Sequence, residues 1–148
     1  MLNRRRGVQQ LPLAAAHFFK KAIMERAQAR PGSRLVLVVE DEPLLLLMAG
    51  DLVEDAGLEP IFASNADDAV RILGDREDVG IVFTDVRMPG SMDGIKLAAA
   101  VRDRWPLIKL VVVSGHLVGY PDLPEGALFF RKPYRSDEII STLRKLAA

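Results

Sequence analysis

The sequence predicts an α/β fold in which helices cover both faces of a parallel β-sheet. From Arg34 onwards, short continuous apolar runs alternate with longer segments whose apolar residues recur at helical spacing. Continuous apolar runs are typical of strands buried on both faces. Strands that alternate with helices are joined by right-handed crossovers, which make the strands parallel. The chain has 148 residues, 49% of them hydrophobic, which suits one domain with a buried core. We therefore expect a doubly wound, five-stranded parallel sheet.

Five segments have the composition of strands, because each is short and rich in β-branched, leucine or aromatic residues. Predicted helices or turn residues separate each segment from the next. The predicted strands are 34–40 (RLVLVVE), 59–64 (EPIFAS), 79–85 (VGIVFTD), 108–115 (IKLVVVSG) and 127–132 (ALFFRK).

Four segments between or after these strands predict helices. The first has Pro43 near its start and Gly57 just past its end, the usual asymmetry of helix ends. Asn65 or a neighbour caps the second helix, and Pro106 stops the third. The predicted helices are 43–57, 65–78, 93–105 and 135–148.

The connection between the fourth and fifth strands breaks this alternation. Residues 116–126 (HLVGYPDLPEG) hold two prolines and two glycines. Proline removes a backbone donor and clashes with the preceding helical turn, so at most one turn of helix is expected. We therefore predict that the fourth helix of the alternating pattern is eroded.

Residues 1–33 differ from the rest of the chain in charge. They carry seven basic residues against Glu25 alone, a net charge of +6, whereas residues 34–148 carry −6. We predict a basic N-terminal extension over 1–33, partly helical or disordered, and one domain over 34–148. The extension is a frayed tail, a leader upstream of a true start at Met24, or an amphipathic helix that docks on a protein or on a membrane surface. Its apolar residues at helical spacing are Ala15, Phe18, Phe19, Ala22 and Ile23.

The composition excludes several classes of protein. The chain has no cysteine, which excludes a disulfide scaffold, a cysteine zinc site and a cysteine nucleophile, and fits a reducing, cytoplasmic compartment. No apolar run approaches the roughly 20 residues of a membrane helix, so no stable membrane insertion is expected. The acidic charge after residue 33 disfavours binding of nucleic acid, because carboxylates repel phosphates.

Charged and hydroxyl residues stand at the carboxyl ends of four predicted strands. Glu40 and Asp41 follow the first strand, and Asp85 ends the third. Ser114 follows the apolar part of the fourth strand, and Lys132 follows that of the fifth. Because the carboxyl ends of parallel strands meet at one edge, where such folds bind ligands, we expect these side chains to share one pocket. Each residue alone has an ordinary alternative: either aspartate can cap the helix that follows it, and the serine and lysine can belong to common turns.

A pocket with three carboxylates has a defined chemistry. The carboxylates repel one another, and a bound divalent cation relieves the repulsion. Oxygen ligands without histidine or cysteine suit Mg2+, with Mn2+ as the alternative. A carboxylate beside such an ion can attack phosphorus and form an acyl phosphate, while the cation and a lysine neutralise charge on the transferring group. The residue types are therefore sufficient for phosphoryl transfer to Asp85.

Residues 34–148 resemble the receiver domain of response regulators in two-component signalling, and are similar to the CheY-like single-domain proteins. The resemblance is carried by VVEDEP, TDVRMPGSMDG, VVVSG and FFRKP, in this order and spacing. It implies a flavodoxin-like or CheY-like sheet with strand order 2-1-3-4-5. The sequence departs from the family in two places. MPGSMDG is one residue longer than the commonest form, and the connection between residues 114 and 132 is short, which argues against a conventional dimer through that face.

The resemblance also implies the acceptor and the metal ligands. Asp85 is the expected phosphoacceptor. Glu40 and Asp41 form the acidic pair, with Asp41 as a direct Mg2+ ligand, and Asp85 and the backbone carbonyl of Arg87 complete the metal site. The family's lysine–proline bond is often cis, so a cis bond between Lys132 and Pro133 is consistent with the resemblance.

Further residues receive roles by the same resemblance. Ser114 is the switch hydroxyl, Lys132 pairs with the phosphate, and Phe129 stands at the position of the switch aromatic, where it has no hydroxyl to leave unsatisfied. Arg87 and His116 flank the acceptor and the switch serine, at positions that modulate the lifetime of the phosphoryl group.

The expected function is that of a single-domain response regulator in bacterial signalling. A histidine kinase or histidine phosphotransfer protein donates the phosphoryl group, and the output is contact with a downstream protein, since no output domain follows Ala148. We expect no enzymatic activity beyond Mg2+-dependent self-phosphorylation and autodephosphorylation. The first alternative is a receiver-like module that binds a partner without phosphorylation. The second is a small phosphatase similar to haloacid dehalogenases, which needs an aspartate where this chain has Arg87.

Overall fold

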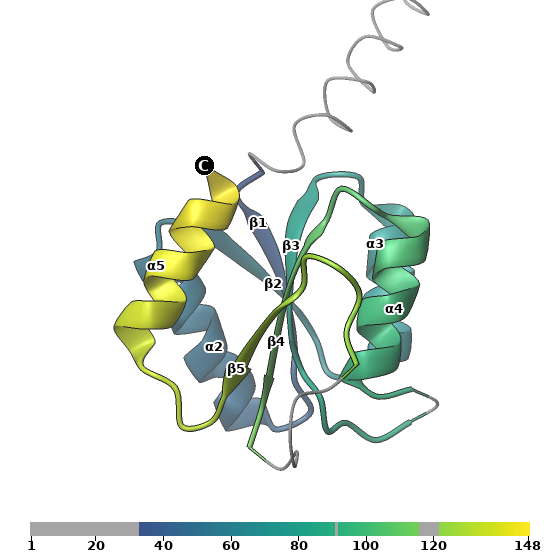
Figure 1. The fold of residues 1–148 in the computed structure, drawn as a ribbon, viewed down its shortest axis with the longest axis horizontal. Coiled ribbons are helices and arrows are strands. Elements are labelled where there is room, and N and C mark those ends of the chain that lie inside the picture. The colour runs from purple at the N-terminus through teal and green to yellow at the C-terminus, as the bar shows by residue number, and fades with distance from the viewer. Residues whose placement is uncertain (1–32, 91, 116–121) are drawn as a thin grey trace, which may run out of the picture.

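The residues that the structure describes form one parallel sheet with helices on both faces (Figure 1). The structure is a computed structural model and describes residues 33–90, 92–115 and 122–148. The strands are β1 (Leu35–Val39), β2 (Glu59–Ala63), β3 (Val79–Asp85), β4 (Lys109–Ser114) and β5 (Leu128–Arg131). They are parallel and lie in the order β2-β1-β3-β4-β5. The predicted fold class and strand order are therefore confirmed.

Two helices pack on each face of the sheet (Figure 1). The helices α2 (Pro43–Asp55) and α5 (Ser136–Ala147) cover one face, and α3 (Ala66–Asp75) and α4 (Gly94–Arg104) cover the other. Side chains alternate between the faces along a strand. In β1, Val36 and Val38 thus join the core under α2 and α5, whereas Leu37 and Val39 join the core under α3 and α4. Burial on both faces explains why the central strands are continuous apolar runs.

Local sequence signals set most helix ends. The side chain of Asn65 accepts a hydrogen bond from the backbone N–H of Asp68 at 2.7 Å, so the predicted cap of α3 is confirmed. Pro43 occupies the first position of α2, where a missing N–H costs nothing. The helix predicted to extend to residue 78 ends at Asp75, because Arg76 is extended (φ −126°, ψ 129°) and its guanidinium pairs with Asp78 at 2.8 Å.

The connection between β4 and β5 contains no helix within its described part, residues 122–127. The chain turns at Gly126, which has a φ of 82°, and the N–H of Ala127 donates to the carbonyl of Pro124 at 3.1 Å. This agrees with the predicted erosion of the fourth helix. Residues 116–121, with His116, lie outside the described residues. The N-terminal extension lies outside them too, except for Ser33, so the division into 1–33 and 34–148 stays a prediction.

None of the described helices has the length and apolar character needed to cross a membrane.

Candidate functional site

Three carboxylates converge at the carboxyl edge of the sheet. Glu40 and Asp41 follow β1, and Asp85 closes β3. One carboxylate oxygen of each lies within 4.8 Å of the corresponding oxygens of the other two. The convergence follows from topology, since β1 and β3 are hydrogen-bonded neighbours with Val39 opposite Thr84. A group of hard oxygen ligands at this spacing fits a divalent cation such as Mg2+.

Lys132 brings a positive charge to the same place. Its Nζ lies 3.6 Å from Oε2 of Glu40 and 3.6 Å from Oδ1 of Asp85. The end of β4 fixes where the lysine stands, because the backbone N–H of Lys132 donates to the carbonyl of Ser114 at 3.1 Å. The peptide bond from Lys132 to Pro133 is cis, in agreement with the resemblance.

Asp41 and Asp85 do not cap the helices that follow them. The N-cap of α4 is Asp93, whose carboxylate accepts from the N–H of Lys96 at 2.9 Å. Oδ1 of Asp85 instead accepts from the N–H of Val86 at 3.0 Å, and the Asp85 side chain is 11% exposed. At α2 the N-cap residue is Glu42, not Asp41. The capping alternatives raised by the sequence are therefore wrong for both aspartates.

Gly94 allows α4 to start directly beneath the acceptor. Its N–H donates to the carbonyl of Val86 at 2.9 Å. A Cβ placed on Gly94 would stand 2.0 Å from the backbone oxygen of Asp85 and 2.9 Å from the Cα of Val86. Both contacts are with backbone, which cannot rotate away as a side chain can. The absence of a side chain at Gly94 thus permits the short distance between α4 and the end of β3.

Glu40 is the most perturbed acid in the described part of the chain. Burial raises the pKa of Glu40 from 4.5 to about 7. The hydrogen bond from the N–H of Glu42 lowers this pKa in part, and the negative charge of Asp85 raises it further. The ammonium of Lys132 lowers the pKa but does not cancel the effect of burial. The carboxyl of Glu40 therefore carries a proton at mildly acidic pH, and a bound cation would favour its release.

Replacement of Glu40 by glutamine should remove a pH-dependent loss of stability. Because the folded state keeps the Glu40 proton between about pH 4.5 and 7 and the unfolded chain does not, the free energy of unfolding falls as pH rises through this window. Without divalent cations, Glu40→Gln should therefore be more stable than the parent at pH 8, by roughly 1–3 kcal/mol, and nearly equal at pH 4. Urea denaturation in EDTA at both pH values measures this, with Glu77→Gln, exposed and outside the acidic pocket, as the matched control. Parallel pH dependence in parent and variant would contradict the assignment.

Ser114 and Phe129 occupy different surroundings. Ser114 is 1% exposed at the end of β4, one residue past Val113, which pairs with Asp85. It is therefore close to the carboxylates in sheet register. Phe129 is half-buried in β5 and packs against the core under α3 and α4. The guanidinium of Arg131 lies 5.8 Å from its ring centroid.

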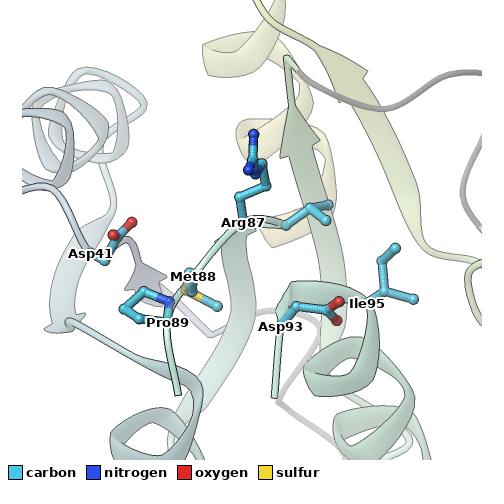
Figure 2. A pocket seen from close by; sticks show the side chains of 7 residues that line it. Asp41, Arg87, Met88, Pro89, Asp93 and Ile95 are labelled. Carbon is cyan, nitrogen blue, oxygen red and sulfur yellow. The ribbon is translucent and has the colours of Figure 1, made fainter. Parts of the chain in front are cut away.

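Two pockets open beside Asp41 and Arg87. The smaller, with a volume of about 230 Å³, is the acidic pocket, and its lining residues are Glu40, Asp41, Glu42, Leu45, Asp85, Arg87, Gly115 and Lys132. The larger, of about 770 Å³, shares Asp41 and Arg87 with the acidic pocket. Its other lining residues come from the loop after β3 and the start of α4, and are Val86, Met88, Pro89, Asp93 and Ile95. Figure 2 shows Asp41 and Asp93 on two sides of it, with the apolar loop residues between them.

Sequence reasoning assigned no role to Met88, Pro89, Asp93 and Ile95 of this larger pocket, or to Tyr134. The sequence signal for the pocket is the long MPGSMDG segment, since its residues Met88, Pro89 and Asp93 line the pocket. Tyr134 lines a third pocket, of about 320 Å³, between α2 and the segment after β5, which also reaches Asp85 and Lys132. Burial, with the charges of Glu40 and Asp85, raises the pKa of Tyr134.

Comparison with known proteins gives consistent relatives. The family described as response regulator receiver domain matches residues 36–144. A putative NtrX-like response regulator of Rickettsia bellii is 28% identical over 117 residues, which are 74% of this chain and 24% of that protein. The chain thus spans about a quarter of the length of the curated relatives it matches.

Solved structures agree with the fold. A response regulator receiver protein from Sinorhizobium medicae has a TM-score of 0.66 and 28% identity, over 76% of this chain and 93% of that one. TrrA of Thermotoga maritima has a TM-score of 0.68 and 24% identity, over 76% of this chain and 97% of that one, and was solved with Mg2+ and beryllium fluoride. TrrA was also solved in complex with the histidine kinase ThkA.

Proposed function

This chain belongs to the response regulator receiver domain family, and we propose that its Asp85 accepts a phosphoryl group from the phosphohistidine of a histidine kinase or of a histidine phosphotransfer protein. The observation that carries the proposal is the convergence of Glu40, Asp41 and Asp85 with the ammonium of Lys132 at one edge of the sheet. Receiver domains are signalling domains rather than classical enzymes, and they interact with histidine kinases, as in the complex of TrrA with ThkA.

The transfer is a displacement at phosphorus. A carboxylate oxygen of Asp85 attacks, the bond from phosphorus to the imidazole nitrogen of the donor breaks, and its electron pair returns to the ring. The product is an acyl phosphate on Asp85. The N–H of Val86, at 3.0 Å from Oδ1, orients the carboxylate, and Lys132 is close enough to balance charge on the incoming group.

The donor set fits Mg2+, with Mn2+ as the alternative. Glu40, Asp41 and Asp85 would hold the ion, together with the backbone carbonyl of Arg87 that the family resemblance adds. The ion would neutralise the negative charge that carboxylates and phosphoryl oxygens bring together. Burial, with the charge of Asp85, raises the pKa of Glu40, so a cation held here would also favour the ionised form of this carboxyl.

The signal would travel through β4 and β5. In our proposal the hydroxyl of Ser114 donates to a phosphoryl oxygen, and the ring of Phe129 turns into the space that the serine leaves. Arg87 is exposed beside the acidic pocket and would modulate the lifetime of the phosphoryl group, as would His116. A small bias between two conformations is sufficient for such a switch. The output would be contact of a stand-alone, cytoplasmic receiver with a downstream protein rather than with nucleic acid.

Labelling with a small phosphodonor tests the proposal. The full chain, incubated with radiolabelled acetyl phosphate, should acquire hydroxylamine-sensitive label with Mg2+ and none in EDTA. Beryllium fluoride with Mg2+ should shift the backbone amide resonances of residues 112–114 and 129–132. Label without any such shift would contradict the switch. Absence of both label and shift would favour the alternative of a module that binds its partner without phosphorylation.

Replacement of Lys132 by alanine should separate acceptance from switching. Lys132 lies 3.6 Å from both Glu40 and Asp85, so its loss leaves the carboxylates and an acyl phosphate without a nearby ammonium. Labelling by acetyl phosphate should persist, while the beryllium fluoride shift around β4 and β5 should fall to less than about a third of the parent's, since about 1 kcal/mol of differential binding shifts a population about fivefold. Lys145→Ala, exposed on α5, should behave like the parent. An undiminished shift in Lys132→Ala would contradict the role.

A further inference from the structure

One face of α2 exposes large apolar side chains to solvent. Leu44, Leu47 and Met48, named here the α2 patch, are 69%, 61% and 53% exposed, and their spacing places them in one stripe. They are half of the six large apolar side chains exposed in the described part of the chain. The ring of Phe62, 41% exposed, stands where a side chain at Gly50 would lie, so the apolar surface extends toward β2. Such concentration of exposed apolar surface is typical of a binding site.

The same face of α2 becomes acidic in the second half of the helix. Asp51 and Asp55 follow the α2 patch at helical spacing and are exposed, and Glu54 lies beside them. The helix has no basic residue. Its outer face is therefore apolar at the N-terminal end and negative at the C-terminal end, which fits a partner helix with apolar residues followed by basic ones.

Residues 15–30 of this chain have that pattern. These residues lie outside the part of the chain that the structure describes. Their two phenylalanines, Phe18 and Phe19, come before the basic residues Lys20, Lys21, Arg26 and Arg30, and Glu25 is their only acid. The spacing also matches, because each of four residues corresponds to a residue of α2 at the same offset of 29 positions. These correspondences are Ala15 with Leu44, Phe18 with Leu47, Phe19 with Met48, and Arg26 with Asp55.

The point where the described chain begins favours this register. Ser33 and Arg34 lie beside the C-terminal end of α2, because the Arg34 guanidinium contacts the carbonyl of Gly57 and the Arg34 carbonyl accepts from the N–H of Glu59 at 2.7 Å. A segment that runs along α2 and continues into Ser33 therefore meets the apolar N-terminal end of α2 first and its acidic C-terminal end last. Residues 31–34 then connect the end of the docked helix to β1, which begins at Leu35, and they can span about 14 Å when extended.

We propose that residues 15–30 dock in cis as a helix on the outer face of α2, parallel to it, with Phe18 and Phe19 on the α2 patch and Arg26 beside Asp55. Apolar burial and opposite charges favour the contact, and the short tether raises the effective concentration of the segment. Met48 also lines the pocket of about 320 Å³ that reaches Asp85. A segment docked on the α2 patch would therefore border the proposed acceptor pocket. The docking itself does not depend on phosphorylation.

The absence of cysteine from the chain permits a direct test by disulfide cross-linking. The full chain with Phe19→Cys and Met48→Cys should form an intramolecular disulfide at least about tenfold faster than the control with Phe19→Cys and Ala99→Cys, since Ala99 is exposed on α4 across the sheet. The pair Phe18→Cys and Leu47→Cys, in the same register, provides a second measurement. Equal rates in test and control pairs would overturn the proposal. Disulfides between two chains would overturn docking in cis in favour of a second copy of this chain. Faster cross-linking only when a second protein is added would overturn it in favour of that protein.

A charge exchange tests the register. In the chain with Phe19→Cys and Met48→Cys, Arg26→Asp should slow the cross-link by about twofold to fivefold, the effect of an exposed ion pair. Adding Asp55→Arg should restore the parent rate. A rate that stays low after the exchange, or that never falls, would contradict the pairing of Arg26 with Asp55.

Discussion

The variant Asp85→Asn is expected to lose all labelling by acetyl phosphate while keeping the fold. An amide oxygen is a poor nucleophile and cannot form a stable acyl phosphate, whereas it can still accept the hydrogen bond that the N–H of Val86 donates to Oδ1 at 3.0 Å. Because the charge of Asp85 raises the pKa of Glu40, the neutral side chain should also lower that pKa. Folding should therefore be at least as stable above pH 7 as in the parent.

The control for this variant is a second aspartate changed in the same way. Asp103 is exposed on α4, outside the residues that line the acidic pocket. Asp103→Asn should be labelled like the parent, measured by retained radioactivity after gel separation with matched circular dichroism spectra. Label that persists on Asp85→Asn would show that another residue is the acceptor.

Among alanine substitutions at the described glycines, Gly94→Ala is expected to cause the largest loss of stability. The added Cβ would stand 2.0 Å from the backbone oxygen of Asp85 and 2.8 Å from its carbonyl carbon. The start of α4 or the end of β3 must move, and overpacking against backbone destabilises by about 3 kcal/mol or more. Since a displaced Asp85 no longer meets Glu40 and Lys132, the surviving folded fraction should also accept label more slowly.

Gly74→Ala is the matched control, because the same methyl group meets no atom within 4 Å at the end of α3. Alanine should stabilise the protein there by about 0.5–1 kcal/mol, since glycine loses more backbone freedom on folding. Urea denaturation of both variants measures the contrast. If Gly94→Ala unfolds at the urea concentration of the parent, the contact between α4 and the end of β3 is looser than described.

The order of helices and strands could be predicted from the sequence because the patterns that specify them are local or repeat along the chain. β1, β3 and β4 are buried on both faces, so their sequences are apolar without interruption. The start of α3 could be predicted because its cap is local: the side chain of Asn65 accepts a hydrogen bond from Asp68, three residues away in sequence. The end of the same helix was missed by three residues, since the pairing of Arg76 with Asp78 in an extended segment has no comparable signal.

Which face of α2 is buried and which is exposed could not be predicted from the sequence. Its first half, PLLLLM, is apolar on all sides, so the sequence predicts a helix without indicating which leucines face the core. The sheet decides this, because Leu46 packs against the core under α2 and α5, while Leu44 and Leu47 point to solvent. The α2 patch, and with it the inferred docking of residues 15–30, becomes visible only after folding.

The sequence by itself determined which chemical groups end the strands, and hence that Glu40, Asp41, Asp85 and Lys132 belong to one edge of the sheet. A parallel sheet places all its carboxyl ends together, so chain order is enough for that conclusion. Only the tertiary structure decided the distances between these groups, the raised pKa of Glu40, and the close approach of Gly94 to the end of β3. These depend on how deeply the packed elements bury each atom, and burial is a property of the whole fold rather than of any segment.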